Sequence, residues 1–271
     1  MTKEIIFKDK RIYYKTSGNG KPVMLLHGFG EDGDIWQKQA EFLAINYKVI
    51  VPDLPGSGNS ELADDMSIEG MAEVVKTILE KEALAPCPVI GHSMGGYITL
   101  ALAEKYPQLL SAFGLFHSTS YDDSEEKKAT RRKAIEFIYN HGSYEFLKTA
   151  IPNLFASASG TTMPAVIAAL IEKGKKIRKE ALITYYEAMI ARPDRTTVLR
   201  NATVPVLFVI GEYDGAVPPA DSLQQSHLSP IADVHILSDA GHMGMLEEVE
   251  RTNHLMERFL NFVAERTESF S

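Results

Sequence analysis

The chain has 271 residues, a formal net charge of −8 at pH 7 and 45% hydrophobic residues. This length and composition fit one globular domain, or one domain with a large insertion. The densest cluster of Lys and Arg, at residues 127–133, directly follows a cluster of acidic residues, so we expect no nucleic-acid partner.

The single cysteine, Cys87, excludes internal disulfide bonds and CxxC metal sites. The N-terminus lacks the apolar core of a signal peptide. No apolar stretch approaches the ~18 residues that a membrane helix needs. We therefore expect a cytoplasmic protein without membrane contact, either a monomer or a homodimer.

The first 117 residues alternate between short apolar runs and helical periodicity. Residues 5–7 and 11–16 flank a turn and predict a hairpin. Further strands are predicted at 23–26, 48–51, 88–90 and 110–116, with helices at 34–44, 67–82 and 95–106. This alternation is typical of a mostly parallel sheet with helices on both faces.

The pattern changes after His117. Residues 118–195 show helical periodicity without convincing strands, with helices predicted at 127–140, 143–149, 164–173 and 179–191. Strands then follow at 206–210 and 234–237, and helices at 221–227 and 247–264. We predict a core formed by residues 1–117 and 196–271, and an all-helical insertion at 118–195.

The segment GHSMGG, at residues 91–96, lies between a predicted strand and a predicted helix and matches G-x-S-x-G. In this pattern a strained turn exposes the serine Oγ, and the small flanking residues let neighbouring backbone pack closely. The helix N-terminus would place the Met94 N–H where an oxyanion forms. Ser93 is therefore a candidate nucleophile, with a plain glycine-rich turn as the alternative.

Two later residues supply the partners that a serine nucleophile needs. His242 follows the last predicted strand and can act as the general base. Asp214 follows the strand at 206–210 and can fix the histidine tautomer. Glu212 is the alternative acid, but the G-x-x-D pattern favours Asp214. The order Ser, Asp, His on an alternating α/β chain is the one expected of α/β-hydrolases.

Over most of its length the sequence resembles the α/β-hydrolase superfamily. Four motifs carry the resemblance: HGFG at 27–30, DLPGSGNS at 53–60, GHSMGG at 91–96 and Gly-His at 241–242. It implies the α/β-hydrolase fold, with residues 118–195 as a helical cap over the site. It also implies that the Phe29 N–H completes the oxyanion hole beside Met94, and that Asp53 organises its loop.

The histidines outside the proposed triad have other expected roles. His27 and His92 flank catalytic positions, where histidines of this family more often order local loops. His117 ends the strand before the insertion and is a candidate pocket-lining residue, with a structural role as the alternative. The remaining histidines show no metal-ligand spacing.

A rival interpretation comes from residues 28–33, which fit the dinucleotide fingerprint G-x-G-x-x-G and precede Asp53 by about 20 residues. We reject it because Glu31, Asp32 and Asp34 would repel a pyrophosphate at the helix N-terminus. It also leaves the serine turn and His242 unexplained. A ligand sensor with very slow turnover is a further alternative.

The predicted function is acyl transfer to water through an acyl-enzyme on Ser93. Haloalkane dehalogenases and soluble epoxide hydrolases place Asp in that turn, so the serine argues against them. We predict a carboxylesterase-like hydrolase of small to medium apolar esters, with carbon–carbon bond hydrolases and thioesterases as alternatives. The expected partner is a small-molecule ester, and no step requires a metal or cofactor.

Overall fold

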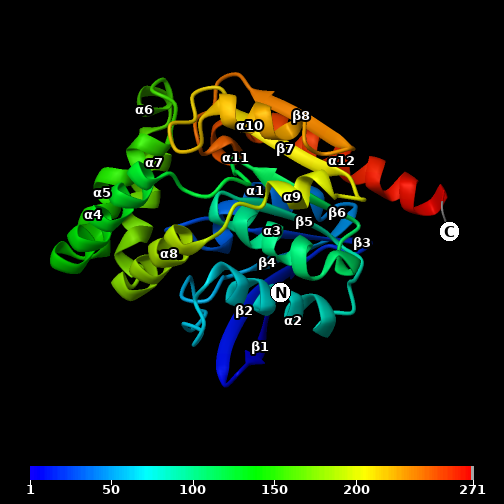
Figure 1. The fold of residues 1–271 in the computed structure, drawn as a ribbon, viewed down its shortest axis with the longest axis horizontal. Coiled ribbons are helices and arrows are strands. Elements are labelled where there is room, and N and C mark those ends of the chain that lie inside the picture. Colours follow the sequence, from blue (N-terminus) through cyan, green and yellow to red (C-terminus); the bar gives the residue numbers. More distant parts are fainter. Residues whose placement is uncertain (270–271) are drawn as a thin grey trace.

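The computed structural model describes residues 1–269. One eight-stranded sheet runs through it in the order β1-β2-β4-β3-β5-β6-β7-β8 (Figure 1). The strands are β1 (Thr2–Phe7), β2 (Lys10–Ser17), β3 (Lys21–Leu26), β4 (Tyr47–Pro52), β5 (Pro88–His92), β6 (Ala112–Phe116), β7 (Val206–Gly211) and β8 (Ala232–Leu237). Only β2 pairs antiparallel, with β1 and β4, and the other pairs are parallel. The predicted hairpin and mostly parallel sheet are confirmed.

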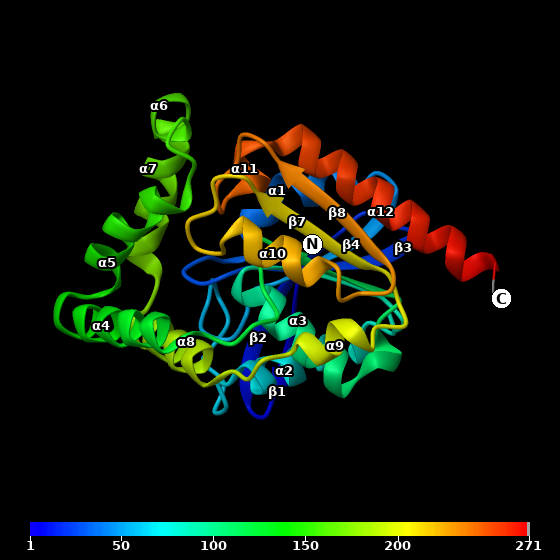
Figure 2. The ribbon, with the colours of Figure 1, turned by 45° about the horizontal axis from the view of Figure 1, so that its top comes forward.

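Helices cover both faces of the sheet. Helices α1 and α12 pack together on one face, and α2, α3 and α10 cover the other (Figure 2). Their bounds are α1 (Gln37–Leu43), α2 (Ile68–Lys81), α3 (Met94–Lys105), α10 (Pro219–Ser226) and α12 (Val249–Ser269). The local sequence determines where α2 begins. The Ser67 hydroxyl accepts the Gly70 N–H at 3.0 Å and so caps the N-terminus of this helix.

The core lies between the central strands and these helices. Trp36 is fully buried and meets the Phe116 ring edge-to-face at 5.0 Å between centroids. The strands β5, β6 and β7 are buried along their whole length, as expected for parallel strands covered on both faces. This burial fixes the carboxyl ends of the strands, where the candidate catalytic residues lie.

Two predicted helices are interrupted in the structure. Residues 34–44 form the 3₁₀ turn η1 (Gly33–Trp36) followed by α1, because the backbone of Trp36 departs from α-helical dihedral angles, with φ −91° and ψ 7°. The predicted helix at 247–264 is broken near its start: Glu247 ends the short helix α11 (Gly244–Glu247), Glu248 adopts φ −127° and ψ 62°, and α12 begins at Val249. Periodicity did not reveal these interruptions because they lie at single residues.

Residues 125–191 form helices and no strand. These are α4 (Glu125–His141), α5 (Ser143–Ala150), α6 (Ser159–Thr162), α7 (Pro164–Lys173) and α8 (Lys179–Ala191), which we call the cap helices. They gather on one side of the sheet, beyond the arrowheads of β7 and β8 (Figure 2). A short helix, α9 (Thr196–Arg200), leads back to β7.

Tyr185 fastens α8 to the core. Its ring is fully buried, its hydroxyl donates to the Pro55 carbonyl at 2.6 Å, and it lies 2.9 Å from the Ser57 hydroxyl. Both partners belong to the 53–60 loop. The buried polar contacts therefore join the cap helices to this loop.

Replacing Tyr185 with Phe should lower the free energy of unfolding by about 1–3 kcal/mol, because the buried Pro55 carbonyl loses its donor. Urea unfolding measures this. Tyr139→Phe is the matched control, since Tyr139 lies on α4 with 68% exposure and should change stability by less than about 0.5 kcal/mol. Equal stability of the two variants would contradict this anchoring role.

Candidate active site

Ser93 occupies a strained turn between β5 and α3. Its φ of 52° and ψ of −115° lie where non-glycine residues are rare. Its N–H donates to the Phe116 carbonyl at 2.9 Å, and its carbonyl accepts the Ser118 hydroxyl at 2.7 Å. A Cβ at Gly91 would overlap the carbonyl of Gly95, so the turn requires glycine there.

The side chain of Ser93 is partly exposed, whereas its neighbours His92 and Met94 are buried. Met94 is the first residue of α3, so its N–H has no acceptor within the helix. The turn therefore presents one hydroxyl and one backbone donor at the carboxyl edge of the sheet.

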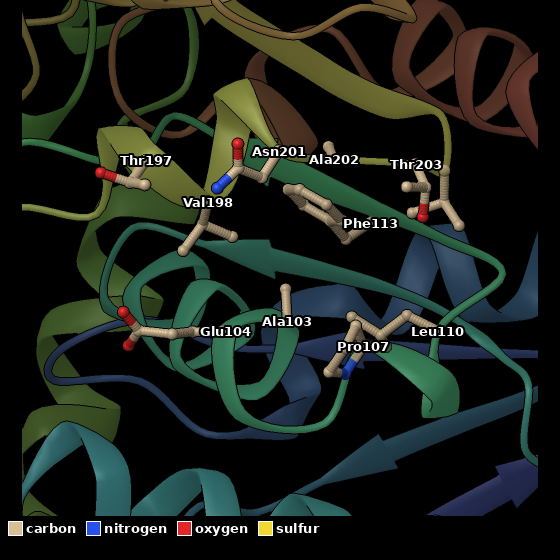
Figure 3. A pocket seen from close by; sticks show the side chains of 11 residues that line it. Ala103, Glu104, Pro107, Leu110, Phe113, Thr197, Val198, Asn201, Ala202 and Thr203 are labelled. Atoms are coloured by element: carbon tan, nitrogen blue, oxygen red, sulfur yellow. The ribbon is translucent and has the colours of Figure 1, made fainter.

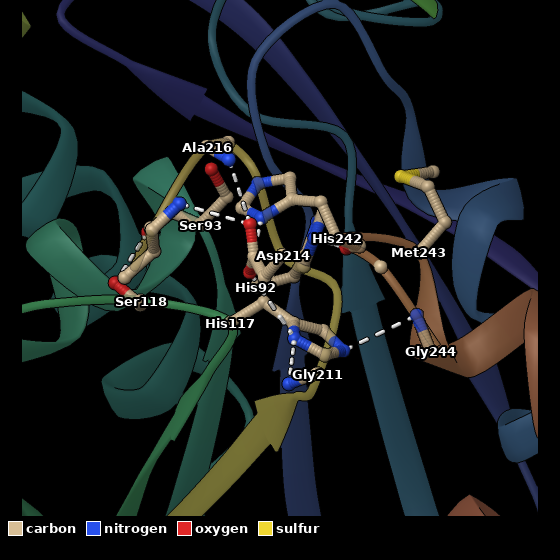
Figure 4. Close-up of polar contacts among 12 residues, drawn as sticks. His92, Ser93, His117, Ser118, Gly211, Asp214, Ala216, His242, Met243 and Gly244 are labelled. Carbon is tan, nitrogen blue, oxygen red and sulfur yellow. Dashed lines mark hydrogen bonds and ion pairs between the residues drawn. The ribbon is translucent and has the colours of Figure 1, made fainter. Parts of the chain in front are cut away.

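Asp214 and His242 meet at that edge. The His242 Nδ1 lies 2.8 Å from Asp214 Oδ2 (Figure 4). The other carboxylate oxygen accepts the N–H groups of Ala216 and Val217, each at 2.8 Å. A carboxylate can only accept here, so Nδ1 carries a hydrogen, and in the neutral ring this leaves the lone pair on Nε2. Figure 4 shows the Ser93 side chain beside the His242 ring.

Burial by itself would raise the pKa of Asp214, but the adjacent His242 with its hydrogen bond, together with the nearby His117, lowers it below its usual range. The alternative acid, Glu212, is exposed. The geometry thus brings together Ser93, Asp214 and His242, and leaves Glu212 at the surface.

A hydrogen bond from His27 fixes the orientation of the peptide group between Gly28 and Phe29. His27 Nδ1 lies 2.9 Å from the Gly28 carbonyl, while its Nε2 accepts the Leu54 N–H at 2.9 Å. Nδ1 therefore carries the hydrogen and donates to that carbonyl. In a trans peptide the N–H of Phe29 points opposite to this carbonyl. A Cβ on Gly28 would lie 3.1 Å from the Ser93 Cβ, so this loop adjoins the serine.

His117 does not line the cavity beside the site, which corrects the expectation of a pocket-lining role. Its side chain is buried behind Asp214, 3.4 Å from Oδ2. Its ring nitrogens lie 3.1 Å from the Gly211 N and 3.2 Å from the Gly244 N (Figure 4). It thus lies between Gly211, which precedes the loop that carries Asp214, and Gly244, which follows the loop that carries His242.

Glu247 is a residue that the sequence did not single out. Its Oε2 accepts the N–H groups of Gly241 and Met243, which flank His242, at 2.8 and 3.2 Å. Its Oε1 accepts from the Ala156 N–H and the Ser159 hydroxyl, both at 2.7 Å. Glu247 therefore connects the loop around His242 to residues 156–159, which lead into α6. Its cap partners are about 90 residues away in sequence, so the local pattern gave no signal for them.

Asp53 joins two loops, as the resemblance implied. Its carboxylate accepts the N–H of Gly33 at 3.0 Å and of Asn59 at 3.2 Å. The Gly28 N–H likewise donates to Glu31, and the Asp34 N–H to Asp32. The backbone donors of a dinucleotide site are thus occupied by carboxylates of the chain itself, which argues against that alternative.

A cavity of about 510 Å³ opens between residues 29–35 and the cap helices. On the core side it reaches Phe29 and Met243, and Met243 directly follows His242. Most of its cap side is aliphatic: Leu147, Ala150, Ile151, Leu154, Val166, Ala169, Leu170 and Ile177. Phe29 stacks on Tyr186 of α8 at 4.2 Å, so the loop and the cap share one wall. Lysine and carboxylate side chains line the rest of the cavity, among them Lys173 and Asp34.

A second cavity of about 370 Å³ lies between α3, α9 and the start of β6 (Figure 3). It is lined mainly by apolar side chains. Ser93, Asp214 and His242 line neither cavity, but the first cavity reaches Phe29 and Met243, which lie close to them.

Within residues 1–269 no three His, Cys, Asp or Glu side chains form a group that could hold a metal ion. None of the helices in this range combines the length and apolar character that crossing a lipid bilayer requires.

Comparison with known proteins gives consistent matches. A family described as the alpha/beta hydrolase fold matches residues 21–135. Lipase 3 of Moraxella sp. (strain TA144) is 27% identical over 90% of this chain and 79% of that protein. A 2-hydroxy-6-oxononadienedioate/2-hydroxy-6-oxononatrienedioate hydrolase of Pseudomonas sp is 26% identical over 92% and 91%.

Among solved structures, a thermophilic esterase from Thermogutta terrifontis superposes with a TM-score of 0.91 at 28% identity. The match covers 97% of this chain and 99% of the esterase. The sheet, the helices that cover its faces and the helical insertion therefore occur together in this esterase as well.

The buried His117 should make stability fall in mild acid. Burial lowers its pKa to about 4, although Asp214 favours the charged form. Between pH 6.5 and 4 the unfolded chain therefore binds more protons than the folded one, and stability decreases as pH falls. The contribution amounts to up to about 3 kcal/mol.

Urea unfolding from pH 7 to 4.5 tests this with His117→Asn, which should lose less stability over that range than the unmodified protein. His227→Asn, at an exposed position at the end of α10, should keep the original slope. If His117→Asn also keeps that slope, the buried neutral ring is not the cause.

Proposed function

Because the chain belongs to the α/β-hydrolase superfamily, we propose that it is a serine hydrolase of carboxylesterase type, acting on small to medium apolar esters. The observation that carries this proposal is the 2.8 Å contact between Asp214 and His242 beside the strained, partly exposed Ser93. A histidine fixed in this tautomer can accept the serine proton.

In the proposed mechanism, His242 Nε2 takes the Ser93 proton as Oγ attacks the ester carbonyl. The N–H groups of Phe29 and Met94 would hold the resulting oxyanion, and among residues 1–269 neither donates a hydrogen bond elsewhere. His242 then returns the proton to the departing alcohol. Water, deprotonated by His242, releases the acid from the acyl-enzyme and restores Ser93.

The aliphatic cavity supports an apolar substrate. It adjoins Phe29 and Met243, so an acyl or alcohol chain lying in it would start near the attacked carbonyl. Residues 118–195, as the proposed cap, would provide most of this surface and determine chain length. The lipase and esterase relatives support an ester, and the hydrolase of Pseudomonas sp keeps carbon–carbon cleavage as the alternative.

Ser93→Ala should reduce kcat for p-nitrophenyl butyrate by on the order of 10⁴ or more, because the nucleophile is removed. Ser157→Ala, an exposed serine of the cap segment, should keep full turnover. Both are measured by release of p-nitrophenol at saturating substrate. Near-normal hydrolysis by Ser93→Ala would overturn the proposal.

Chain-length preference should follow the cavity. For p-nitrophenyl esters from acetate upward, kcat/KM should rise roughly fourfold per methylene until the cavity is filled, because each buried CH₂ contributes about 0.8 kcal/mol. Val166→Trp, which narrows the cavity, should move the optimum to shorter chains. Val234→Trp, at a 38% exposed position on β8, should not. Faster cleavage of matching thioesters would instead assign the protein as a thioesterase.

A further inference from the structure

We propose that Glu31 and His92 form a buried, charged pair that positions the oxyanion loop relative to the general base. The inference rests on the proposed function and concerns residues outside its catalytic triad. Glu31 follows the oxyanion loop, and His92 ends β5, directly before the nucleophile.

Both nitrogens of the His92 ring face hydrogen-bond acceptors. Nδ1 lies 3.0 Å from Glu31 Oε2, and Nε2 lies 2.9 Å from the His242 carbonyl oxygen. Neither a carboxylate nor a carbonyl can donate a hydrogen, so both ring nitrogens must carry one. His92 is therefore an imidazolium, and Glu31 is its counter-ion.

The pair is enclosed in the protein. The His92 side chain is 1% exposed and the Glu31 side chain 7%. Burial opposes charge on both groups, but each partner's charge and hydrogen bond outweigh it, which raises the pKa of His92 and lowers the pKa of Glu31. Removing one partner would leave a buried charge without compensation.

The pair connects two parts of the reaction site. Glu31 Oε2 also accepts the Gly28 N–H at 2.7 Å, in the peptide immediately before the one that presents the Phe29 donor. The other end of the pair holds the backbone of His242 itself. Three hydrogen bonds thus run from the oxyanion loop to the base, so a shift at one end would displace the other.

The pair also sets the charge near the base. The rings of His92 and His242 lie 4.9 Å apart between centroids. The other ionisable groups facing His242 and its loop are Asp214, His117 and Glu247. The His92 cation therefore lies beside the ring of the base, with Glu31 as its own partner.

The test compares Glu31→Gln, His92→Gln and the double variant with the unmodified protein, using p-nitrophenyl butyrate between pH 5 and 9. Each single change should lower kcat about 10- to 100-fold, as when a positioned group loses its support. Each should also move the acid limb of kcat/KM, because the charge that His92 places beside the base changes. The double variant should resemble either single variant, because the two groups act as one unit.

Glu82→Gln is the matched control. Glu82 is 8% exposed and pairs with Lys3 and Lys48 away from the site. It should lose stability but keep kcat and the acid limb. The burst of p-nitrophenol counts folded, competent sites in every sample, so that misfolding cannot be taken for lost catalysis.

If Glu31→Gln and His92→Gln match Glu82→Gln in kcat and acid limb while Ser93→Ala is inactive, the positioning role is wrong and the proposed function stands. If the two losses in kcat multiply in the double variant, Glu31 and His92 act independently, and the proposal that they act as one pair is wrong. Turnover that does not depend on Ser93 would remove both proposals.

Discussion

The site depends on one backbone constraint, the turn at which β5 becomes α3. Ser93 is held at φ 52°, and conformations of this kind cost about 1–3 kcal/mol. The cost is met by surrounding contacts, among them the bonds to Phe116 and Ser118 on the neighbouring strand and its extension. Gly91 and Gly95 make the turn possible, since a side chain on Gly91 would collide with the backbone of Gly95. The same turn directs a hydroxyl and a helix N-terminus toward one point.

Around this turn the chain assembles three buried histidines and two buried carboxylates. His92, His117 and His242 come from the ends of β5 and β6 and from the loop before α11, and their ring centroids lie 4.9 to 6.1 Å apart. The groups around the three rings differ, so their hydrogen-bonding roles differ. His92 faces two acceptors, His117 faces two backbone N–H groups, and His242 has a carboxylate on one side only. Similar side chains therefore acquire separate roles through their hydrogen-bond partners.

Much of the fold and of the candidate triad was predictable because the signals are local. Alternating apolar runs predict the strands, and the glycine spacing around Ser93 predicts the turn. Asp214 and His242 each follow a strand closely, and parallel strands bring their carboxyl ends to one edge. The bridging role of Glu247 was not predictable, since it depends on contacts with Ala156 and Ser159 far along the chain. His117 was expected at the pocket, yet the packing of β6 against β7 places its ring behind the acid.

The sequence by itself determined the order of strands and helices, the serine turn and the identity of the three candidate catalytic residues, because spacing and periodicity encode these over a few residues. Only the tertiary structure decided which carboxylate meets His242, and that Glu31 and His92 are paired ions. Those outcomes depend on distances between segments that are 28 and 61 positions apart in the chain. Charge state follows from burial and from the nearest partner, and both exist only after the sheet has brought these segments together.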